Sequence, residues 1–388
     1  MITVDEAILK IRENTGGKVE ERILVEDACG YSLAEDVFSP INMPPFNQSA
    51  MDGYAVVANG NSSFNLIGEV KAGDDQLLVV KEGEAIRIFT GAMIPDGANA
   101  VIRQEDVERI ENTIKVEKEI QEGANIRLLG EQITKGVCAI EKGTQLTPGA
   151  IGFLSMLGYL DVLVYAKPKV TVIVTGNELM KPGETLELGK IYESNSTMLS
   201  AAMSQLGISV ELRSVKDDYQ STVEVIDKAI KEMDLVIMTG GISVGYYDFV
   251  GDALKELEVK EHFYKVKQKP GKPLFYGTKE GKSIFALPGN PGAVLSCFYA
   301  YVLPCVYQLM GRNGVNTTIS GRLTADYKKT AKLTHFLKAR ILEGKVEILT
   351  GQSSAMLNSF VTANCIAKLE SGREEWSEGD EISVIPLI

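Results

Sequence analysis

The chain has 388 residues, of which 45% are hydrophobic and 24% charged, so it has the composition of an ordinary globular protein with about two to four domains. Its 40 basic and 52 acidic residues give a net charge of −12, which disfavours nucleic acid and anionic membranes as partners. The chain's two histidines, His262 and His335, are too few for a metal site built from several histidines. Any anionic ligand must therefore be held by local donors.

The cysteines and the N-terminal residues indicate a cytoplasmic protein. The five cysteines include no C-x-x-C pair, which favours a reducing compartment over a disulfide scaffold or a zinc site. Asp5 and Glu6 interrupt the N-terminus, so no signal peptide is expected. The uncharged stretch Ser283–Gly311 is long enough to span a membrane, but Pro288 and Pro304 break it. We interpret it as a buried strand, a turn and a buried helix, with no membrane partner.

In chain order, the first predicted elements are one helix followed by short strands. Thr3 and Glu6 form a capping box at the start of an amphipathic helix over residues 3–14. From about residue 20 to 165, short β-branched runs alternate with Gly, Pro, Asn and Asp, which predicts small β-rich units. A short helix is expected over Pro148–Leu157, with Thr147 as its N-cap and Gly158 just past its end.

From residue 168 onward, apolar strands alternate with helices. The predicted strands are Val170–Thr175, Ile208–Val215, Leu235–Thr239 and Ile284–Leu287. The predicted helices are Met198–Leu206, Ser221–Met233, Phe249–Leu257 and Ala293–Met310. Fully apolar strands in this alternation favour a parallel sheet with helices on both faces. After Arg312 the pattern returns to short strands, which predicts a separate small C-terminal β domain in a multidomain α/β protein.

Three of these strands are followed by turns that contain glycine. Ligands of an open parallel sheet bind beyond the carboxyl ends of the strands, and glycine lets backbone N–H groups approach an anion. One such turn would more often be structural, but three at one edge predict a phosphate or oxyanion site. Its candidate residues are Thr175, Gly176, Gly240, Gly241, Ser243, Pro288, Asn290 and Pro291.

Charged residues gather near the same edge. The acids are Glu178, Asp217, Asp218 and Asp248. Each alone is more often a helix cap or a solvated loop residue, but together, beside an oxyanion site, they favour a bridging Mg²⁺. In a strand, Lys265, Lys267 and Lys269 share one face, and Pro270 would direct Lys272 back toward the sheet. These lysines either meet an anion or protect an edge strand.

Several strings resemble the molybdopterin molybdotransferase family, which includes the MoeA proteins and the E domain of gephyrin. They occur in the family's order over essentially the whole chain. The strings are SAMDGYAV at Ser49–Val56, TGA with P-x-G-A at Thr90–Ala98, NIR with GE at Asn125–Glu131, TGNEL at Thr175–Leu179, TGGISVG at Thr239–Gly245, KPGKP at Lys269–Pro273, LPGNP at Leu287–Pro291, and GQSS with a distant AN at Gly351–Ser354 and Ala363–Asn364.

The resemblance implies a homodimer whose site lies where the α/β domain of one protomer faces the β-rich domain of the other. The implied parts are a first helix (1–20) that packs with the α/β domain, a linking domain (21–45 and 135–167), a β-rich domain (46–134), a molybdopterin-binding α/β domain (168–310) and a C-terminal β-barrel-like domain (311–388). The implied reaction converts adenylyl-molybdopterin and molybdate, the co-substrate, into molybdenum cofactor and AMP, with Mg²⁺ as cofactor. Handover partners would be the preceding adenylyltransferase and recipient molybdoenzymes.

The resemblance also assigns roles to individual residues. Catalytic roles fall to Asp52 and Thr90 of the facing protomer and to Glu178, Asp218 and Asp248, of which Glu178 and Asp248 serve the metal. Substrate or oxyanion binding falls further to Lys265, Lys269, Lys272, Arg127, Arg340, Ser353 and Ser354. Gln132 and Tyr246 stand where the family usually has acids, so neither receives a metal role.

Two alternatives stay open at this point. A molybdopterin adenylyltransferase, or a related nucleotide-processing enzyme, shares the TGG turn but does not explain the SAMDGYA string or the C-terminal domain. A scaffold in the manner of gephyrin would bind receptor tails, and it would be expected to carry a second enzyme domain and a long linker. Release of AMP that depends on molybdate distinguishes the three functions.

Overall fold

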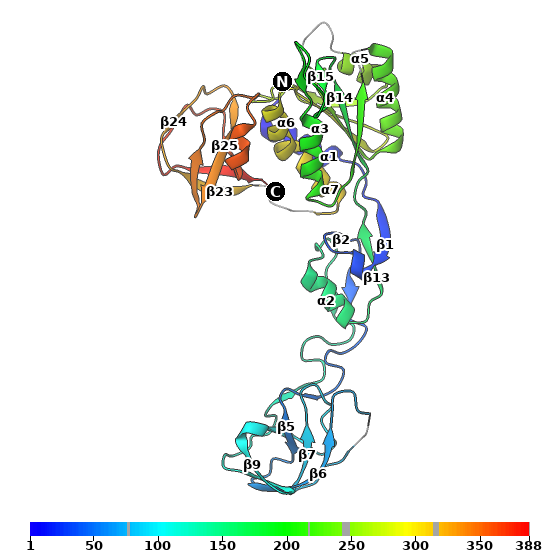
Figure 1. Ribbon diagram of the computed structural model, residues 1–388, viewed down its shortest axis with the longest axis vertical. Helices are drawn as coiled ribbons and strands as arrows, with labels where there is room; N and C mark the ends of the chain where they lie inside the picture. The colour runs from blue at the N-terminus through cyan, green and yellow to red at the C-terminus, as the bar shows by residue number, and fades with distance from the viewer. Residues whose placement is uncertain (76–77, 216–217, 243–248, 313–317, 388) are drawn as a thin grey trace. The chain divides into compact units, whose positions relative to one another are not determined.

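The computed structural model describes residues 1–75, 78–215, 218–242, 249–312 and 318–387. The chain divides into two compact units, which are described separately (Figure 1). The first unit comprises Met1–Ala34, Gly143–Thr147 and Asp161–Ile388, and the second comprises Glu35–Lys142 and Pro148–Leu160. The predicted linking domain, 21–45 and 135–167, has residues in both units, and the predicted domain boundaries stay a prediction.

A six-stranded sheet forms the centre of the first unit. Its strands, in spatial order, are β17 (Val210–Val215), β14 (Val170–Thr175), β18 (Leu235–Thr239), β22 (Lys282–Leu287), β21 (Phe275–Lys279) and β19 (Lys260–Tyr264). The first four are parallel, as predicted, whereas β21 and β19 pair in the antiparallel sense. The sequence did not predict this antiparallel edge, because Lys260, Glu261 and Gly277 interrupt the apolar pattern typical of buried strands.

Helices cover both faces of this sheet, which confirms the predicted layering (Figure 1). One face packs against α1 (Val4–Asn14), α3 (Asn195–Ser204), α6 (Pro291–Cys297) and α7 (Leu303–Leu309), and the other against α4 (Tyr219–Glu232) and α5 (Phe249–Glu256). Neighbouring residues of a strand point to opposite faces, so Val172 joins the first core and Ile173 the second. The predicted capping box of α1 is confirmed, because Glu6 Oε2 accepts a 2.7 Å hydrogen bond from the Thr3 N–H, and the Glu6 N–H donates to Thr3 Oγ1.

The predicted helix over Ala293–Met310 is interrupted. A π-helical turn, Phe298–Val302, separates α6 from α7, and Pro304, which lacks an N–H, lies just after it. By length and composition Pro291–Leu309 could cross a membrane, but 78% of its 18-residue apolar stretch is buried inside the protein. This burial supports its interpretation as a core helix.

The C-terminal part of the first unit is a closed five-stranded barrel, as expected. Its strands, in order, are β25 (Thr334–Leu342), β26 (Lys345–Ile348), β23 (Ile319–Leu323), β29 (Glu381–Pro386) and β27 (Cys365–Leu369), and β27 pairs back with β25. Three smaller elements accompany the barrel: α8 (Asn358–Thr362) and the paired strands β24 (Tyr327–Lys328) and β28 (Glu375–Trp376). The short strand β20 (Gln268–Lys269) pairs in parallel with β25 and so joins the barrel to the α/β domain.

Shorter sheets complete the molecule. In the first unit, β1 (Glu20–Leu24), β13 (Asp161–Tyr165) and β2 (Ser32–Leu33) form a three-stranded sheet, and β15 (Leu179–Met180) pairs with β16 (Ile191–Tyr192). In the second unit, the main sheet has the order β8 (Ala100–Arg103), β5 (Gly53–Val56), β7 (Glu84–Ile88), β6 (Ser63–Val70), β10 (Thr113–Val116) and β9 (Val107–Ile110). Two further pairs in that unit are β11 (Ile126–Arg127) with β4 (Gln48–Ser49), and β12 (Cys138–Ile140) with β3 (Val37–Phe38).

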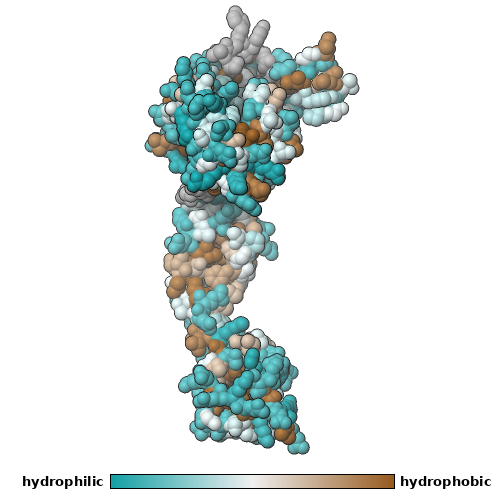
Figure 2. Space-filling model, turned by 90° about the vertical axis from the view of Figure 1, so that its left-hand side faces the viewer, coloured by the Kyte–Doolittle hydropathy of each residue, from teal (hydrophilic) through white to brown (hydrophobic). Residues whose placement is uncertain are grey.

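The helix α2 (Pro148–Met156) of the second unit confirms the predicted short helix, but it buries little of its apolar surface. Leu154 is its buried residue, whereas Met156 is 43% exposed and nearby Leu160 is 75% exposed. The space-filling view shows apolar, brown surface on this part of the chain (Figure 2). An unpaired apolar surface of this kind is typical of a protein–protein contact.

Candidate active site

The three glycine-containing turns meet in one cavity of about 660 Å³, which we call the strand-end cavity. It lies beyond the carboxyl ends of β14, β18 and β22, where an open parallel sheet binds its ligands. The predicted residues that line it are Thr175, Gly176, Glu178, Gly240, Gly241, Pro288, Asn290 and Pro291. The convergence predicted from the sequence is therefore present in the fold.

Two threonine hydroxyls in the wall of this cavity have no hydrogen-bond partner among the residues that the structure describes. Thr175 and Thr239 are 7% and 1% exposed, and the Oγ1 atom of each is buried and unsatisfied. Glycine is required beside them, because a Cβ on Gly240 would lie 2.8 Å from the Thr175 carbonyl oxygen and its φ is +86°. Buried hydroxyls without a partner are costly, so the site is suited to a ligand rich in oxygen or nitrogen.

Glu178 supplies an exposed carboxylate to the strand-end cavity. Its backbone carbonyl accepts a 2.9 Å hydrogen bond from the Ile191 N–H, which links the loop after β14 to β16. Its Oε2 lies 2.8 Å from the position that a Cβ on Gly176 would take, so a larger residue at 176 would displace the acid. A second acid in the cavity wall, Glu193, is already engaged, because it accepts hydrogen bonds from the N–H and hydroxyl of Ser196.

The other predicted acids of this edge have different positions. Asp218 is the N-cap of α4, where its Oδ2 accepts a 2.8 Å hydrogen bond from the Ser221 N–H. Hydrogen bonds from Ser221 hold the pKa of Asp218 below its usual value, and the residue does not line the strand-end cavity. Asp218 therefore caps α4, and its predicted catalytic role stays a prediction. Ser243, Asp217 and Asp248 lie outside the described residues.

The described side chains could hold Mg²⁺ only if phosphate groups of the substrate also bind it. Within the described ranges, no group of three or more His, Cys, Asp or Glu side chains is arranged to hold a metal ion. Mg²⁺ is usually bound through one or two carboxylates, water and substrate phosphates, so a dedicated cluster is not required. Glu178 is suited to that arrangement because its carboxylate is exposed at the cavity that would hold the phosphate.

A second cavity of about 630 Å³, the seam cavity, lies between the α/β domain and the barrel. It shares Pro273, Pro288 and Asn290 with the strand-end cavity. The other polar residues that line it are Lys269, Tyr327, His335, Gln352, Ser353 and Ser354. Sequence reasoning predicted Lys269, Ser353 and Ser354. It gave no role to Gln352, although Gln352 lies in the GQSS string, and it missed Tyr327 and His335, because no local motif marks them.

The predicted lysine-bearing strand is wrong. Lys265 has a left-handed backbone, φ +68°, which ends β19 at Tyr264, and its Nζ lies 4.6 Å from the centre of the Tyr264 ring. Only Gln268–Lys269 forms a strand, so the three lysines do not share a face. Of the predicted cationic ligands in this unit, Lys269 lines a cavity, whereas Lys265, Lys272 and Arg340 line neither.

In the second unit Asp52 and Thr90, to which the resemblance assigns catalytic roles, are hydrogen-bonded to each other. Asp52 Oδ1 accepts hydrogen bonds from the Thr90 N–H (2.8 Å) and hydroxyl (2.7 Å). The Thr90 N–H, its hydroxyl and the charge of Arg87 hold the pKa of Asp52 below its usual value, so the carboxylate is ionised at neutral pH. The segment is fixed further by Ser49, which exchanges backbone hydrogen bonds with Gly91 and Ala92.

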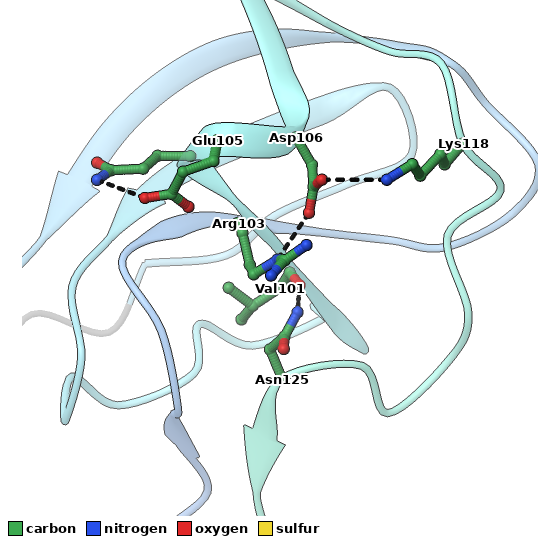
Figure 3. Close-up of polar contacts among 7 residues, drawn as sticks. Val101, Arg103, Glu105, Asp106, Lys118 and Asn125 are labelled. Atoms are coloured by element: carbon green, nitrogen blue, oxygen red, sulfur yellow. Dashed lines mark hydrogen bonds and ion pairs between the residues drawn. The ribbon is translucent and has the colours of Figure 1, made fainter.

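The NIR string has a structural role beside this loop. Asn125 has a left-handed backbone, φ +55°, and its Nδ2 donates a 2.8 Å hydrogen bond to the Val101 carbonyl (Figure 3). Figure 3 also shows Asp106 accepting from Arg103 at 2.7 Å and from Lys118 at 3.5 Å. Arg127 itself is exposed on β11, and no described ligand-binding cavity includes it. Its predicted binding role stays a prediction.

His335 makes stability depend on pH. It is 8% exposed, and its Nε2 has no partner within the described ranges. Burial, with the charges of Lys329 and Lys269, lowers its pKa to about 4. In the unfolded chain the pKa of histidine is about 6.5. Between pH 6.5 and pH 4 the unfolded chain therefore binds more protons than the folded protein, so the free energy of unfolding falls as the pH drops through this range. We expect a loss of about 2 kcal/mol by pH 5 from this group. Urea unfolding of wild type and His335→Gln at pH 7 and pH 5 checks it, and equal losses in both proteins would contradict it.

Comparison with known proteins identifies the family of all three parts of the chain. Family models match at residues 2–158 (MoeA N-terminal region, domain I and II), 171–308 (probable molybdopterin binding domain) and 320–387 (MoeA C-terminal region, domain IV). A molybdopterin molybdenumtransferase of Staphylococcus epidermidis is 34% identical over 99% of this chain and 95% of its own length. One from Staphylococcus aureus is 33% identical with the same coverage.

Solved structures agree with the sequence relatives. The molybdopterin biosynthesis MoeA protein from Pyrococcus horikoshii has a TM-score of 0.85 and 31% identity, over 100% of this chain and 99% of that one. A molybdenum cofactor biosynthesis protein from Pyrococcus furiosus, at 19% identity and a TM-score of 0.62, shares the fold over the same length. The chain therefore belongs to the MoeA family of molybdopterin molybdenumtransferases.

Proposed function

We propose that the protein inserts molybdenum into molybdopterin, converting adenylyl-molybdopterin and molybdate into molybdenum cofactor and AMP. The observation that carries this proposal is the strand-end cavity, in which three glycine-containing turns, two unsatisfied threonine hydroxyls and the Glu178 carboxylate meet. The names of the relatives, molybdopterin molybdenumtransferases at 33–34% identity over nearly the whole chain, support the same activity.

In this proposal each cavity binds one of the two reactants. The strand-end cavity receives the phosphate side of the substrate, where backbone N–H groups of the glycine turns and the Thr175 and Thr239 hydroxyls bind oxygen atoms. The seam cavity receives molybdate, a tetrahedral oxyanion, through Lys269, Ser353 and Ser354. Because the cavities share Pro288 and Asn290, both reactants can lie side by side.

The site must neutralise the negative charge of its reactants and products. Cleavage of the phosphoanhydride leaves negative charge on AMP, and bound Mg²⁺ would neutralise part of it. Glu178, with Asp248, would hold that ion, while Lys269 compensates charge on the oxyanion side. No protein nucleophile is needed, so these residues act by binding and orientation.

We further propose that the protein works in the cytoplasm as a homodimer, with Asp52 and Thr90 of one protomer completing the site of the other. The exposed apolar surface at α2, with Met156 and Leu160, supports an interface between copies. The ionised Asp52 carboxylate, held by Thr90, is suited to orient a donor group of the substrate. The adenylyltransferase that makes the substrate and the recipient molybdoenzymes would be its handover partners.

The test is AMP release. Purified protein incubated with adenylyl-molybdopterin, Mg²⁺ and molybdate should release AMP, and omission of molybdate or chelation of Mg²⁺ should abolish release. Consumption of ATP with free molybdopterin would instead indicate an adenylyltransferase, and folded protein without either activity would leave a scaffold function. Either of those results would overturn the proposal.

A further inference from the structure

A buried lysine in the barrel lies directly behind the loop that lines the two cavities. Lys338, on β25, is 3% exposed, and its Nζ donates hydrogen bonds to the carbonyl oxygens of Gly351 (2.8 Å), Ser353 (2.9 Å) and Met356 (2.6 Å). An ammonium group has three N–H donors, so all of them point into this one loop, residues 351–356. The lysine therefore sets where three of the loop's carbonyls lie.

The backbone of the same residue fastens the loop a second time. Gln352 Oε1 accepts a 3.0 Å hydrogen bond from the Lys338 N–H, and Gln352 Nε2 donates to the Lys338 carbonyl at 2.9 Å and to the Leu349 carbonyl at 2.7 Å. Five hydrogen bonds thus join Lys338 to residues 351–356. The side chain and the backbone of one residue therefore both hold this loop.

The burial of Lys338 is unfavourable unless the loop keeps its shape. Burial lowers the pKa of the Lys338 ammonium, and the hydrogen-bond partners found for it in the described parts of the chain are carbonyls, not carboxylates. The Lys338 Nζ also lies 5.4 Å from the centre of the Phe360 ring, so carbonyl dipoles and one aromatic face are the contacts that offset its burial. A buried cation held in this way is stable only while those dipoles stay in place. The loop and the lysine therefore stabilise each other.

The loop held by Lys338 forms part of the wall of both cavities. Ser353 and Ser354 line the seam cavity, and Ala355 lines the strand-end cavity. Ser354 Oγ accepts a 2.9 Å hydrogen bond from Asn290 Nδ2, and a Cβ on Gly292 would lie 2.8 Å from the Ser354 carbonyl oxygen. A shift of the loop by a fraction of an ångström would therefore disturb the turn after β22.

We propose that Lys338 is a positioning residue for the oxyanion: it holds the loop 351–356 in the shape that presents Ser353 and Ser354 to the seam cavity. This inference rests on the proposed function, because it takes the seam cavity to be the molybdate site. Lys338 is not among the residues that line the cavity, so it would act on the oxyanion through the loop. Its loss should weaken oxyanion binding more than it slows turnover at saturation.

The test compares Lys338→Met with Lys329→Met. Lys329 is a matched control, because it is 9% exposed and donates to three carbonyls, those of Thr330, Leu333 and Arg373, none of which lines either cavity. The charge of Lys329 also lowers the pKa of His335, which lines the seam cavity, so both variants are assayed at about pH 8, where His335 is neutral with or without that charge. We expect Lys338→Met to raise the KM for molybdate at least tenfold, with a change of less than threefold in kcat, and Lys329→Met to leave both within about twofold.

Two further measurements keep the inference separate from folding and from the proposed function. Amide hydrogen exchange at residues 351–356 should become faster in Lys338→Met and not in Lys329→Met, whether or not the protein turns over. If Lys338→Met does not fold, Ser359→Ala removes a hydroxyl whose one O–H is shared between the Thr350 (2.9 Å) and Gly351 (3.0 Å) carbonyls at the start of the loop. This milder change should raise the KM for molybdate about threefold. An unchanged KM and unchanged exchange in folded variants would overturn the inference, whereas an inactive wild type would overturn the proposed function.

Discussion

Replacement of Glu178 by Gln should lower molybdate-dependent AMP release about a hundredfold to a thousandfold while the fold is retained. The substitution keeps the shape of the side chain and removes its charge. Of the two acids in the described part of the strand-end cavity, Glu193 is held by Ser196, so Glu178 is the carboxylate that can bind a ligand or ion. Loss of one preorganised electrostatic partner in an active site has an effect of this size. Steady-state AMP release at saturating Mg²⁺ and molybdate measures it.

The control for this prediction is an acid in the next loop along the chain. Glu187, between β15 and β16, is exposed and does not line the cavity, so Glu187→Gln changes the net charge by the same amount at a short distance from the site. Its activity should stay within about twofold of wild type, because exposed charges are screened by solvent and salt. Equal losses in the two variants, or wild-type turnover in Glu178→Gln, would remove Glu178 from the proposed site.

Replacement of Asp52 by Asn should lower AMP release about a hundredfold. The Thr90 N–H and hydroxyl both donate to Asp52 Oδ1, and these contacts keep the pKa of the acid low, so a charged group is lost at any pH at which the enzyme works. An Asn side chain can still accept through its carbonyl oxygen, so the loop should keep its shape. The expected loss therefore reflects the charge and not the loop.

Asp106→Asn is the matched control for Asp52. Asp106 belongs to the same unit, and the side chains of Arg103 and Lys118 lower its pKa (Figure 3). Its variant should turn over like wild type. If both variants lose activity alike, the effect of Asp52→Asn would come from a general disturbance of this unit, and Asp52 would be a loop-capping residue.

Local sequence patterns were sufficient to predict the parts of the fold that depend on neighbouring residues. The capping box of α1 and the apolar runs of β14, β18 and β22 depend on residues within a few positions of one another, and the structure confirms them. Once the strands are parallel, the convergence of their terminal turns follows from topology, which is why the strand-end cavity was predictable.

Features that depend on distant pairing were not predictable in this way. Lys265 was placed in a strand because its neighbours alternate, but its backbone is left-handed, and only the pairing of β20 with β25 positions Lys269 at the seam cavity. His335 and Lys338 lie on a strand without a motif, and their environments arise from elements far along the chain. Asp218 shows a further limit of sequence patterns, since a helix-capping acid gives the same sequence signal as a catalytic one.

The central claim is that the Asp52–Thr90 pair and the strand-end cavity form one site across two protomers. The most direct test mixes inactive Asp52→Asn dimers with inactive Glu178→Gln dimers and allows subunits to exchange. Half of the dimers are then mixed, and each mixed dimer has one site with both acids and one site with neither, so about one quarter of wild-type activity should return. If each chain instead used its own Asp52 and Glu178, every site would keep one lesion. Activity near zero after verified exchange would then contradict the account.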